Sequence, residues 1–301
     1  MGNGAAQLSM DRCTLCPRAC GVDRTAKTGF CGVGAMPVVA RAALHYFEEP
    51  CISGTRGSGT VFFTGCNLRC VFCQNESISR GKGGKTVTPA RLREIYSELI
   101  AQGAHNINLV TPSHFADAVA ASLEGGLPVP VVYNCGGYES VETLRKLEGK
   151  VQIYLPDFKY ADTGLAARYS AAPDYPAVAE AAIREMYRQT GDFAFDDDGL
   201  LTRGVLIRHL VLPGNLRNTF GVIDRVRELF PRDGQVLFSL MSQYTPVVNL
   251  PQFPELCRRL TQEEYAAAEQ YLFDSGIEDG FVQDRASAET DYIPAFDGTG
   301  V

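Results

Sequence analysis

Short apolar runs alternate along the chain with stretches in which apolar residues recur at helical spacing. The runs are rich in β-branched and aromatic residues, which is typical of buried strands. We predict strands at 60–65, 106–111, 130–134, 151–155, 205–212 and 236–241. We predict helices at 88–100, 140–147, 176–188, 218–230 and 261–274. Such alternation indicates a parallel sheet with helical crossovers, and six units favour an α/β fold of the open, partial (β/α)6 barrel type.

Length and composition set the limits of this prediction. At 301 residues, 45% apolar and 21% charged, the chain is long enough for one large domain and a small extension. We expect a cysteine-rich, metal-binding extension at 1–54, the barrel at 55–260, and a C-terminal helix and tail at 261–301. The net charge of −7, without a long basic run, argues against a nucleic-acid partner. No apolar run approaches a membrane span and the first residues show no secretory signal, so we expect a cytoplasmic protein.

The ten cysteines are grouped at spacings that suit metal ligation better than disulfides. Cys66, Cys70 and Cys73 form a C-x3-C-x2-C motif directly after the first predicted strand. An ordinary four-iron cluster takes four cysteine ligands, so three ligands would leave one iron open for catalysis. A structural zinc site is the alternative for so short a motif, and the position after a strand favours the catalytic cluster.

A second group of four thiols lies nearer the N-terminus. It consists of Cys13, Cys16, Cys20 and Cys31. Four thiols suffice for a closed site, and the spacing is compatible with either tetrahedral zinc or a second iron–sulfur cluster. Cys51 is compatible with a replacement ligand or, as we favour, a buried thiol; we interpret Cys257 as a core residue and assign no role to Cys135.

Polar residues follow several of the predicted strands. Asn134, Asp157 and Gln243 each come just past a strand end, as Cys66 does. In parallel α/β folds the active site gathers at the carboxyl ends of the strands, so we expect these residues to lie together. Arg208 and its neighbour His209 alternate along one strand, so only one of them should point into the barrel.

The motif in this setting resembles that of the radical S-adenosylmethionine (SAM) superfamily, and the chain resembles an uncharacterised branch related to the pyruvate formate-lyase activating enzyme. Besides the cysteine motif, the resemblance rests on the segments 13–20, 49–54, 154–160, 208–214 and 239–246. It implies that a [4Fe-4S] cluster on the three cysteines cleaves SAM reductively to a 5′-deoxyadenosyl radical for hydrogen abstraction. It also implies an anaerobic enzyme with a flavodoxin-like or ferredoxin-like reductant.

The resemblance also implies several SAM contacts. Phe72 stands where the superfamily has an aromatic residue near the adenine. Asp157 and Lys159 match an Asp-x-Lys motif of the activating enzymes, whose aspartate helps to seat a cation beside the SAM carboxylate. Arg208 lies on a strand whose arginine contacts SAM in the relatives.

Two departures separate the chain from the activating enzymes. Asn134 stands where they have aspartate, so the cation site should be weakened or lost. Thr111 and Ser113 occupy the place of a Gly-Gly-Glu-Pro type motif, so the glutamate is missing and only their oxygen atoms remain as acceptors for SAM.

Three functions are compatible with these features. The first is activation of a glycyl radical enzyme, which would then be the protein partner. The second is radical SAM modification of a small molecule, or of a peptide or protein other than a glycyl radical enzyme. The third, a non-catalytic metal-binding protein, is disfavoured because a six-unit barrel with polar strand ends is excessive for metal storage.

Overall fold

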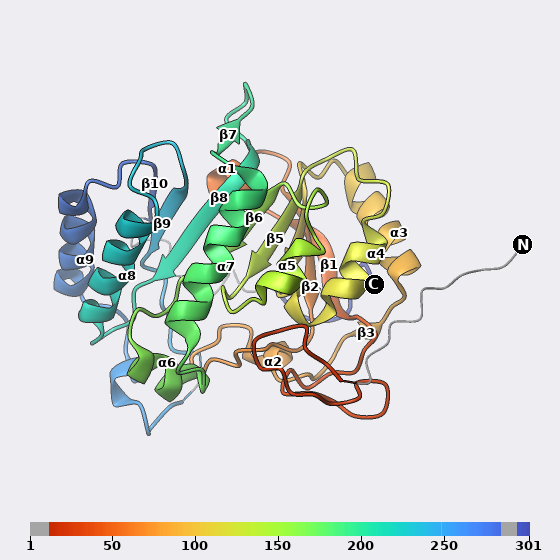
Figure 1. The fold of residues 1–301 in the computed structure, drawn as a ribbon, viewed down its shortest axis with the longest axis horizontal. Coiled ribbons are helices and arrows are strands. Elements are labelled where there is room, and N and C mark those ends of the chain that lie inside the picture. Colours follow the sequence, from red (N-terminus) through yellow and green to blue (C-terminus); the bar gives the residue numbers. More distant parts are fainter. Residues whose placement is uncertain (1–11, 248, 284–293) are drawn as a thin grey trace, which may run out of the picture.

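The computed structural model describes residues 12–247, 249–283 and 294–301 (Figure 1). Within them, a mixed sheet has the strand order β10-β9-β8-β6-β5-β4-β2-β1-β3. The strands that run parallel are β2 (Ser58–Phe63), β4 (Ile107–Val110), β5 (Val131–Cys135), β6 (Ile153–Pro156), β8 (Leu201–Leu210), β9 (Leu237–Met241) and β10 (Gly280–Val282). The antiparallel strands are β1 (Val38–His45), β3 (Lys85–Thr86) and β7 (Ala194–Phe195).

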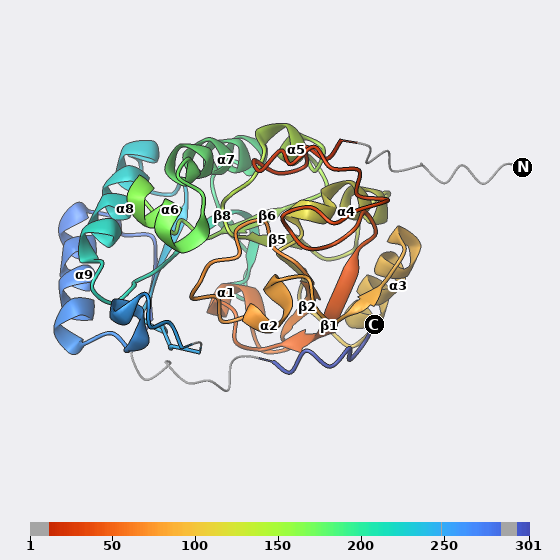
Figure 2. The ribbon, with the colours of Figure 1, turned by 90° about the horizontal axis from the view of Figure 1, so that it is seen from below.

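An arc of helices lies around the outside of the sheet (Figure 2). It consists of α3 (Pro89–Ala101), α4 (Ala116–Ser122), α5 (Val141–Arg145), α7 (Tyr175–Thr190), α8 (Leu216–Leu229) and α9 (Gln262–Ser275). The other helical elements are α1 (Pro50–Ser53), α2 (Glu76–Ser79), α6 (Thr163–Ser170) and the 3-10 turns η1 (Ser113–Phe115) and η2 (Pro254–Cys257). This arrangement confirms the predicted α/β partial barrel, and β10 adds one short parallel strand beyond the six predicted.

The core lies between the sheet and this arc. Every residue of β2, β5 and β6 is buried, as expected of parallel strands covered on both faces. Helix α3 shows how the sequence directs its packing. The Thr88 hydroxyl accepts the Arg91 backbone N–H at 3.1 Å, and the helix buries Leu92, Ile95, Tyr96 and Leu99, as predicted. Each such fully buried apolar side chain contributes about 1.5–3 kcal/mol.

Three features of the sheet differ from the sequence prediction. Residues 38–45, which the sequence analysis included in the extension, form β1 and pair antiparallel with β2. Strand β8 begins at Leu201 rather than at 205, because its first residues pair with β7. Residues 294–301 lie along β1, where Gly298 N–H donates to Ala40 O at 3.0 Å and Ala42 N–H donates to Thr299 O at 2.9 Å. The rest of the predicted acidic tail, 285–293, lies outside the described residues.

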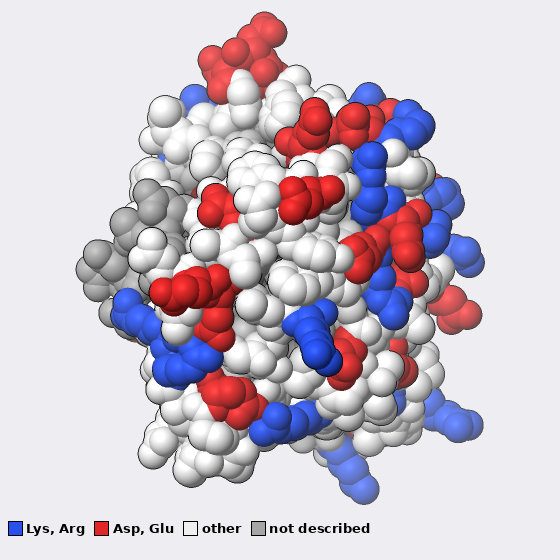
Figure 3. All heavy atoms as spheres, turned by 90° about the vertical axis from the view of Figure 1, so that its left-hand side faces the viewer, with Lys and Arg blue, Asp and Glu red and all other residues white. Residues whose placement is uncertain are grey.

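The face that carries α8 and α9 bears charged side chains of both signs (Figure 3). Acidic and basic side chains are intermixed over that face (Figure 3). Within the described part of the chain, every helix is too short or too polar to span a bilayer.

Candidate functional site

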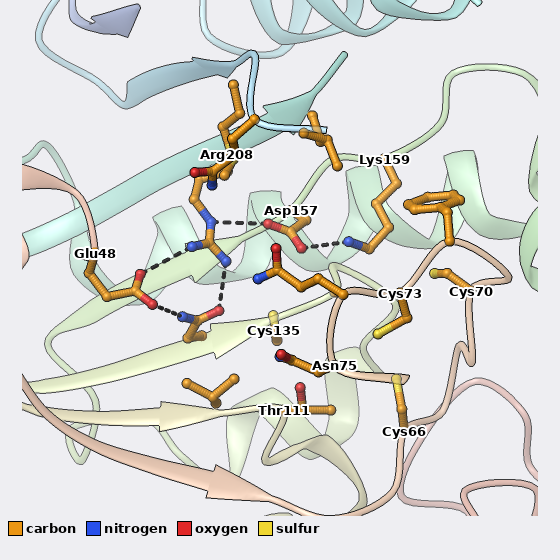
Figure 4. Close-up of a pocket in the computed structure, with 18 of the residues that line it drawn as sticks. Glu48, Cys66, Cys70, Cys73, Asn75, Thr111, Cys135, Asp157, Lys159 and Arg208 are labelled. Atoms are coloured by element: carbon orange, nitrogen blue, oxygen red, sulfur yellow. Dashed lines mark hydrogen bonds and ion pairs between the residues drawn. The ribbon is translucent and has the colours of Figure 1, made fainter. Parts of the chain in front are cut away.

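A cavity of about 210 Å³ lies at the carboxyl ends of the parallel strands. One side of it is formed by Cys66, Cys70 and Cys73, and the opposite side by charged residues of β8 and of the segments that follow β6 and β1 (Figure 4). The cavity also contains Thr111 and Asn134, which stand just after β4 and within β5. The predicted gathering of strand-end residues is therefore present.

The cysteine loop leaves β2 through a glycine that no larger residue could replace without strain. Gly65 has φ +89°, and a Cβ there would lie 2.7 Å from Cys31 O. Burial and, to a smaller extent, the neighbouring sulfurs of Cys70 and Cys66 raise the pKa of the Cys73 thiol to about 12. The three sulfurs thus lie within electrostatic reach of one another. Their protons must be displaced when a metal binds.

The chemistry of this donor set fits a cluster. Cys66, Cys70 and Cys73 supply three soft thiolate donors to one cavity, and such donors suit an iron–sulfur cluster, whose cysteine ligands bind separate irons.

A network of charged and amide groups lines the far side of the cavity (Figure 4). Arg208 donates through Nε to Asp157 Oδ1 at 3.0 Å, through one terminal nitrogen to Glu48 Oε2 at 3.1 Å, and through the other to Asn134 Oδ1 at 2.8 Å. Lys159 Nζ donates to the second oxygen of Asp157 at 2.6 Å. Burial opposes the charged form of Asp157, but Lys159 and Arg208 outweigh it and hold the pKa of that carboxyl below its usual range.

Most of the residues that we predicted to contact SAM line the cavity. Phe72, Asn134, Asp157, Lys159 and Arg208 all line the cavity, as Thr111 does. Phe72 also lies edge-on to the rings of Tyr160, Tyr169 and Tyr244, with centroids 6.4, 6.1 and 6.3 Å away.

Ser113 differs from its prediction, because it is buried behind the cavity rather than on its wall. Its hydroxyl donates to Glu139 Oε1 at 2.5 Å, and the Tyr133 hydroxyl donates to the other oxygen at 3.1 Å. Burial raises the pKa of Glu139 to about 7. Ser113 is thus occupied with a buried carboxyl group.

Arg208 and His209 point to opposite sides of β8, as the alternation of the strand predicts. Arg208 lines the cavity, whereas His209 Nδ1 lies 2.7 Å from Phe158 O and its Nε2 lies 3.0 Å from Thr219 Oγ1. Burial lowers the pKa of His209 to about 4, so the ring is neutral at physiological pH. Its role is to join β8 to its neighbours.

The four N-terminal cysteines lie in a segment beside the cysteine loop, at the end of the sheet that carries α2 and α6 (Figure 1). A Cβ on Gly29 would lie 3.1 Å from Cys20 Sγ and 3.6 Å from Cys31 Sγ. Burial raises the pKa of the Cys16 thiol to about 12, with smaller contributions from Glu139, Cys13 and Cys31. The thiols are therefore neighbours, and the identity of a metal on them stays a prediction.

Sequence reasoning missed several residues of the site. Glu48 binds Arg208 and accepts the Asn134 amide at 3.3 Å, and Glu49, which also lines the cavity, accepts the Ser239 hydroxyl at 2.8 Å. The sequence did contain a signal for Glu49, because this residue begins one of the segments that carry the family resemblance.

Comparison with known proteins agrees with the ligand chemistry. Residues 53–120 match the model of a 4Fe-4S single cluster domain, and this range contains β2, the three-cysteine loop and β4. The uncharacterized protein MJ0674 of Methanocaldococcus jannaschii is 30% identical over 268 residues, which cover 85% of this chain and 72% of that protein. The chain belongs to the same family as MJ0674.

Solved structures with similar architecture include Streptococcus suis SuiB bound to S-adenosylmethionine. It has a TM-score of 0.48 and 12% identity over 73% of this chain and 48% of SuiB, so the chain spans about half of that protein. A domain of a pyruvate-formate lyase-activating enzyme from Bacteroides vulgatus has a TM-score of 0.35 and 13% identity, over 65% of this chain and 91% of that domain.

Proposed function

We propose that this chain is a radical SAM enzyme in which Cys66, Cys70 and Cys73 hold a [4Fe-4S] cluster whose fourth iron binds SAM. The observation that carries the proposal is the convergence of these thiols on one cavity at the carboxyl ends of parallel strands, within the matched 4Fe-4S domain. The family resemblance of the surrounding segments supports it. When bound, cluster and SAM together supply a one-electron cleavage that yields a radical for hydrogen abstraction.

The chain's own residues would bind and orient SAM. Phe72, next to Cys73 in the loop, offers an apolar ring for the adenine. Arg208 and Lys159 offer charged donors for a carboxylate, and Asp157 supplies acceptor oxygens for hydroxyl or ammonium groups. Because these three side chains already restrain one another, the site is ordered before its ligand binds.

Anaerobic reconstitution tests this proposal. We expect the protein to take up iron and sulfide, to give a reduced-cluster EPR signal that changes when SAM is added, and to cleave SAM in the presence of dithionite. Cys66→Ala, Cys70→Ala or Cys73→Ala should each abolish the cleavage. The prediction that Cys257 is buried is wrong, because this residue of η2 is exposed; Cys257→Ala is therefore the matched control and should retain the cleavage. Full SAM cleavage by Cys70→Ala protein would overturn the assignment.

For the substrate, we propose a loop of a glycyl radical enzyme, because the resemblance is to the enzymes that activate such partners. Two apolar residues of the cavity wall, Phe47 and Val247, are 58% and 39% exposed, which suits contact with a polypeptide. Adding a candidate glycyl radical enzyme should then increase SAM cleavage and produce a glycyl radical signal. Stimulation by a small molecule or an unrelated peptide instead would favour the second function given above.

A further inference from the structure

The sulfur of Cys70 receives a hydrogen bond from a side chain far away in the sequence. Ser170 Oγ, at the C-terminal end of α6, donates to Cys70 Sγ at 3.0 Å. Behind it, the Tyr160 hydroxyl lies 2.7 Å from Ser170 Oγ. Ser170 is 3% exposed, Tyr160 is fully buried and Cys70 is 6% exposed, so water does not compete strongly for these bonds.

The other two cysteines are bound differently. Cys66 Sγ accepts the backbone N–H of Leu68 at 3.3 Å and lies 4.0 Å from Asn67 Oδ1, and both of these partners belong to the cysteine loop. Backbone donors belong to the loop itself and are present whatever side chains follow. Among the described residues, Cys70 is the one of these three cysteines whose sulfur accepts a hydrogen bond from a side-chain hydroxyl outside the loop.

The position of Ser170 is fixed by its neighbours. Val71 N–H donates to Tyr169 O at 2.9 Å, which joins the cysteine loop to the end of α6. Arg18 donates to Ser170 O at 2.7 Å, and Ala171, with φ +48°, ends the helix. The hydroxyl is thus held against the sulfur by three separate segments of the chain.

Donors of this kind change the redox properties of a cluster. Hydrogen bonds to cysteine sulfur stabilise the more negative, reduced state and raise the reduction potential. We propose that Ser170, oriented by Tyr160, tunes the reduction potential of the [4Fe-4S] cluster through the sulfur of Cys70. This inference rests on the proposed function, because it requires the three cysteines to hold a cluster.

The test is an EPR-monitored redox titration of the reconstituted protein. In Ser170→Ala protein, the ratio of reduced to oxidised cluster at a fixed potential should fall about tenfold, which equals about 59 mV for a one-electron couple. Tyr160→Phe should shift the potential in the same direction by less, and Ser170→Thr, which keeps a hydroxyl, should restore it. These shifts should be present at full iron content.

A matched control exists elsewhere in the fold. The Tyr96 hydroxyl lies 3.1 Å from Ser122 Oγ in an equally buried pair between α3 and α4, and neither residue lines the cavity. Ser122→Ala should leave the potential unchanged. If Ser170→Ala protein loses its cluster, the reduction potentials of the Tyr160→Phe and Ser170→Thr proteins test the inference in its place.

Equal potentials in wild-type, Tyr160→Phe and every iron-loaded Ser170 variant would overturn the inference while leaving the proposed function intact. Failure of the wild-type protein to bind iron would instead overturn the proposed function. The iron content and the potential therefore separate the two failures.

Discussion

The backbone N–H of Cys66 donates a hydrogen bond to the carbonyl oxygen of Cys31, with an N···O distance of 3.3 Å. The first cysteine of the three-cysteine loop is thereby joined to the last cysteine of the N-terminal group. Arg18 strengthens this junction, because its guanidinium donates to Asn67 O at 2.8 Å and to Ser170 O at 2.7 Å, and also to the carbonyl of Ala171. The N-terminal segment therefore supports the loop that carries Cys66, Cys70 and Cys73.

Replacing Arg18 should weaken that support. We expect Arg18→Ala to lower the free energy of unfolding by about 1–3 kcal/mol, because charge-assisted hydrogen bonds to several carbonyl groups are lost together. We also expect faster loss of iron from the reconstituted protein, measured by iron content over time in the presence of a chelator. Arg203→Ala, at an exposed position of β8, is the control. Equal iron loss in both variants would contradict the prediction.

Removing one N-terminal thiol should affect folding more than chemistry. Cys13 is buried, and its backbone bonds to Val22 and Gly21 hold the segment together. If the four thiols bind a metal, Cys13→Ala should lower its content and the melting temperature, because the binding energy of a structural site is folding energy. SAM cleavage per mole of folded, iron-loaded protein should be retained. Unchanged stability and metal content would count against a closed site.

The buried ion pairs of the cavity should be costly to break. Asp157→Ala removes one of the two carboxylate partners of Arg208, whose side chain is 13% exposed. It also removes the carboxylate partner of Lys159. We expect a loss of about 3–5 kcal/mol in unfolding free energy, measured by urea unfolding, together with weaker SAM binding. Arg91→Ala removes a surface pair with Glu98 on α3 and should cost about 1 kcal/mol or less. Similar losses of unfolding free energy in both variants would contradict the prediction that the buried network stabilises the fold more than a surface ion pair does.

Stability should depend on pH through Glu139. This carboxyl has an ordinary pKa of 4.5, which burial raises to about 7 in the folded protein. Between these values the unfolded chain releases the proton while the folded protein keeps it, so stability falls as the pH rises. The total loss is on the order of 3 kcal/mol.

Glu139→Gln, which cannot ionise, isolates this contribution. The difference in unfolding free energy between wild type and variant should change between pH 4.5 and 7 and level off above that range. Tyr133 and Cys135, which face the carboxyl, keep their protons there because burial raises the pKa of both. If the unfolding free energies of the two proteins changed in parallel with pH, the raised pKa of Glu139 would be ruled out.

Most of the barrel could be predicted because its strands are short apolar runs separated by amphipathic helices. Strand β1 was missed because it is rich in alanine, which has little preference for strands, and only its pairing with β2 makes it one. Strand β10 has three residues, too few to give a pattern.

The site could be predicted only where its residues belong to a local motif. The three cysteines lie close together in the sequence, between positions 66 and 73. In contrast, Glu48 binds an arginine 160 positions away and Ser170 binds a cysteine 100 positions away. Such contacts depend on how the strands and loops converge. Ser113 shows the reverse case, since its position in a motif suggested a ligand contact and the fold gave it a buried partner instead.

The C-terminal segment along β1 also has a mechanical consequence. Strand β10 lies at one edge of the open sheet, and after it the chain returns to β1, near the other edge, where Gly298 and Thr299 are bonded (Figure 2). These bonds cover an edge that would otherwise be open to pairing with another chain. The C-terminal segment can leave the sheet only after these bonds break.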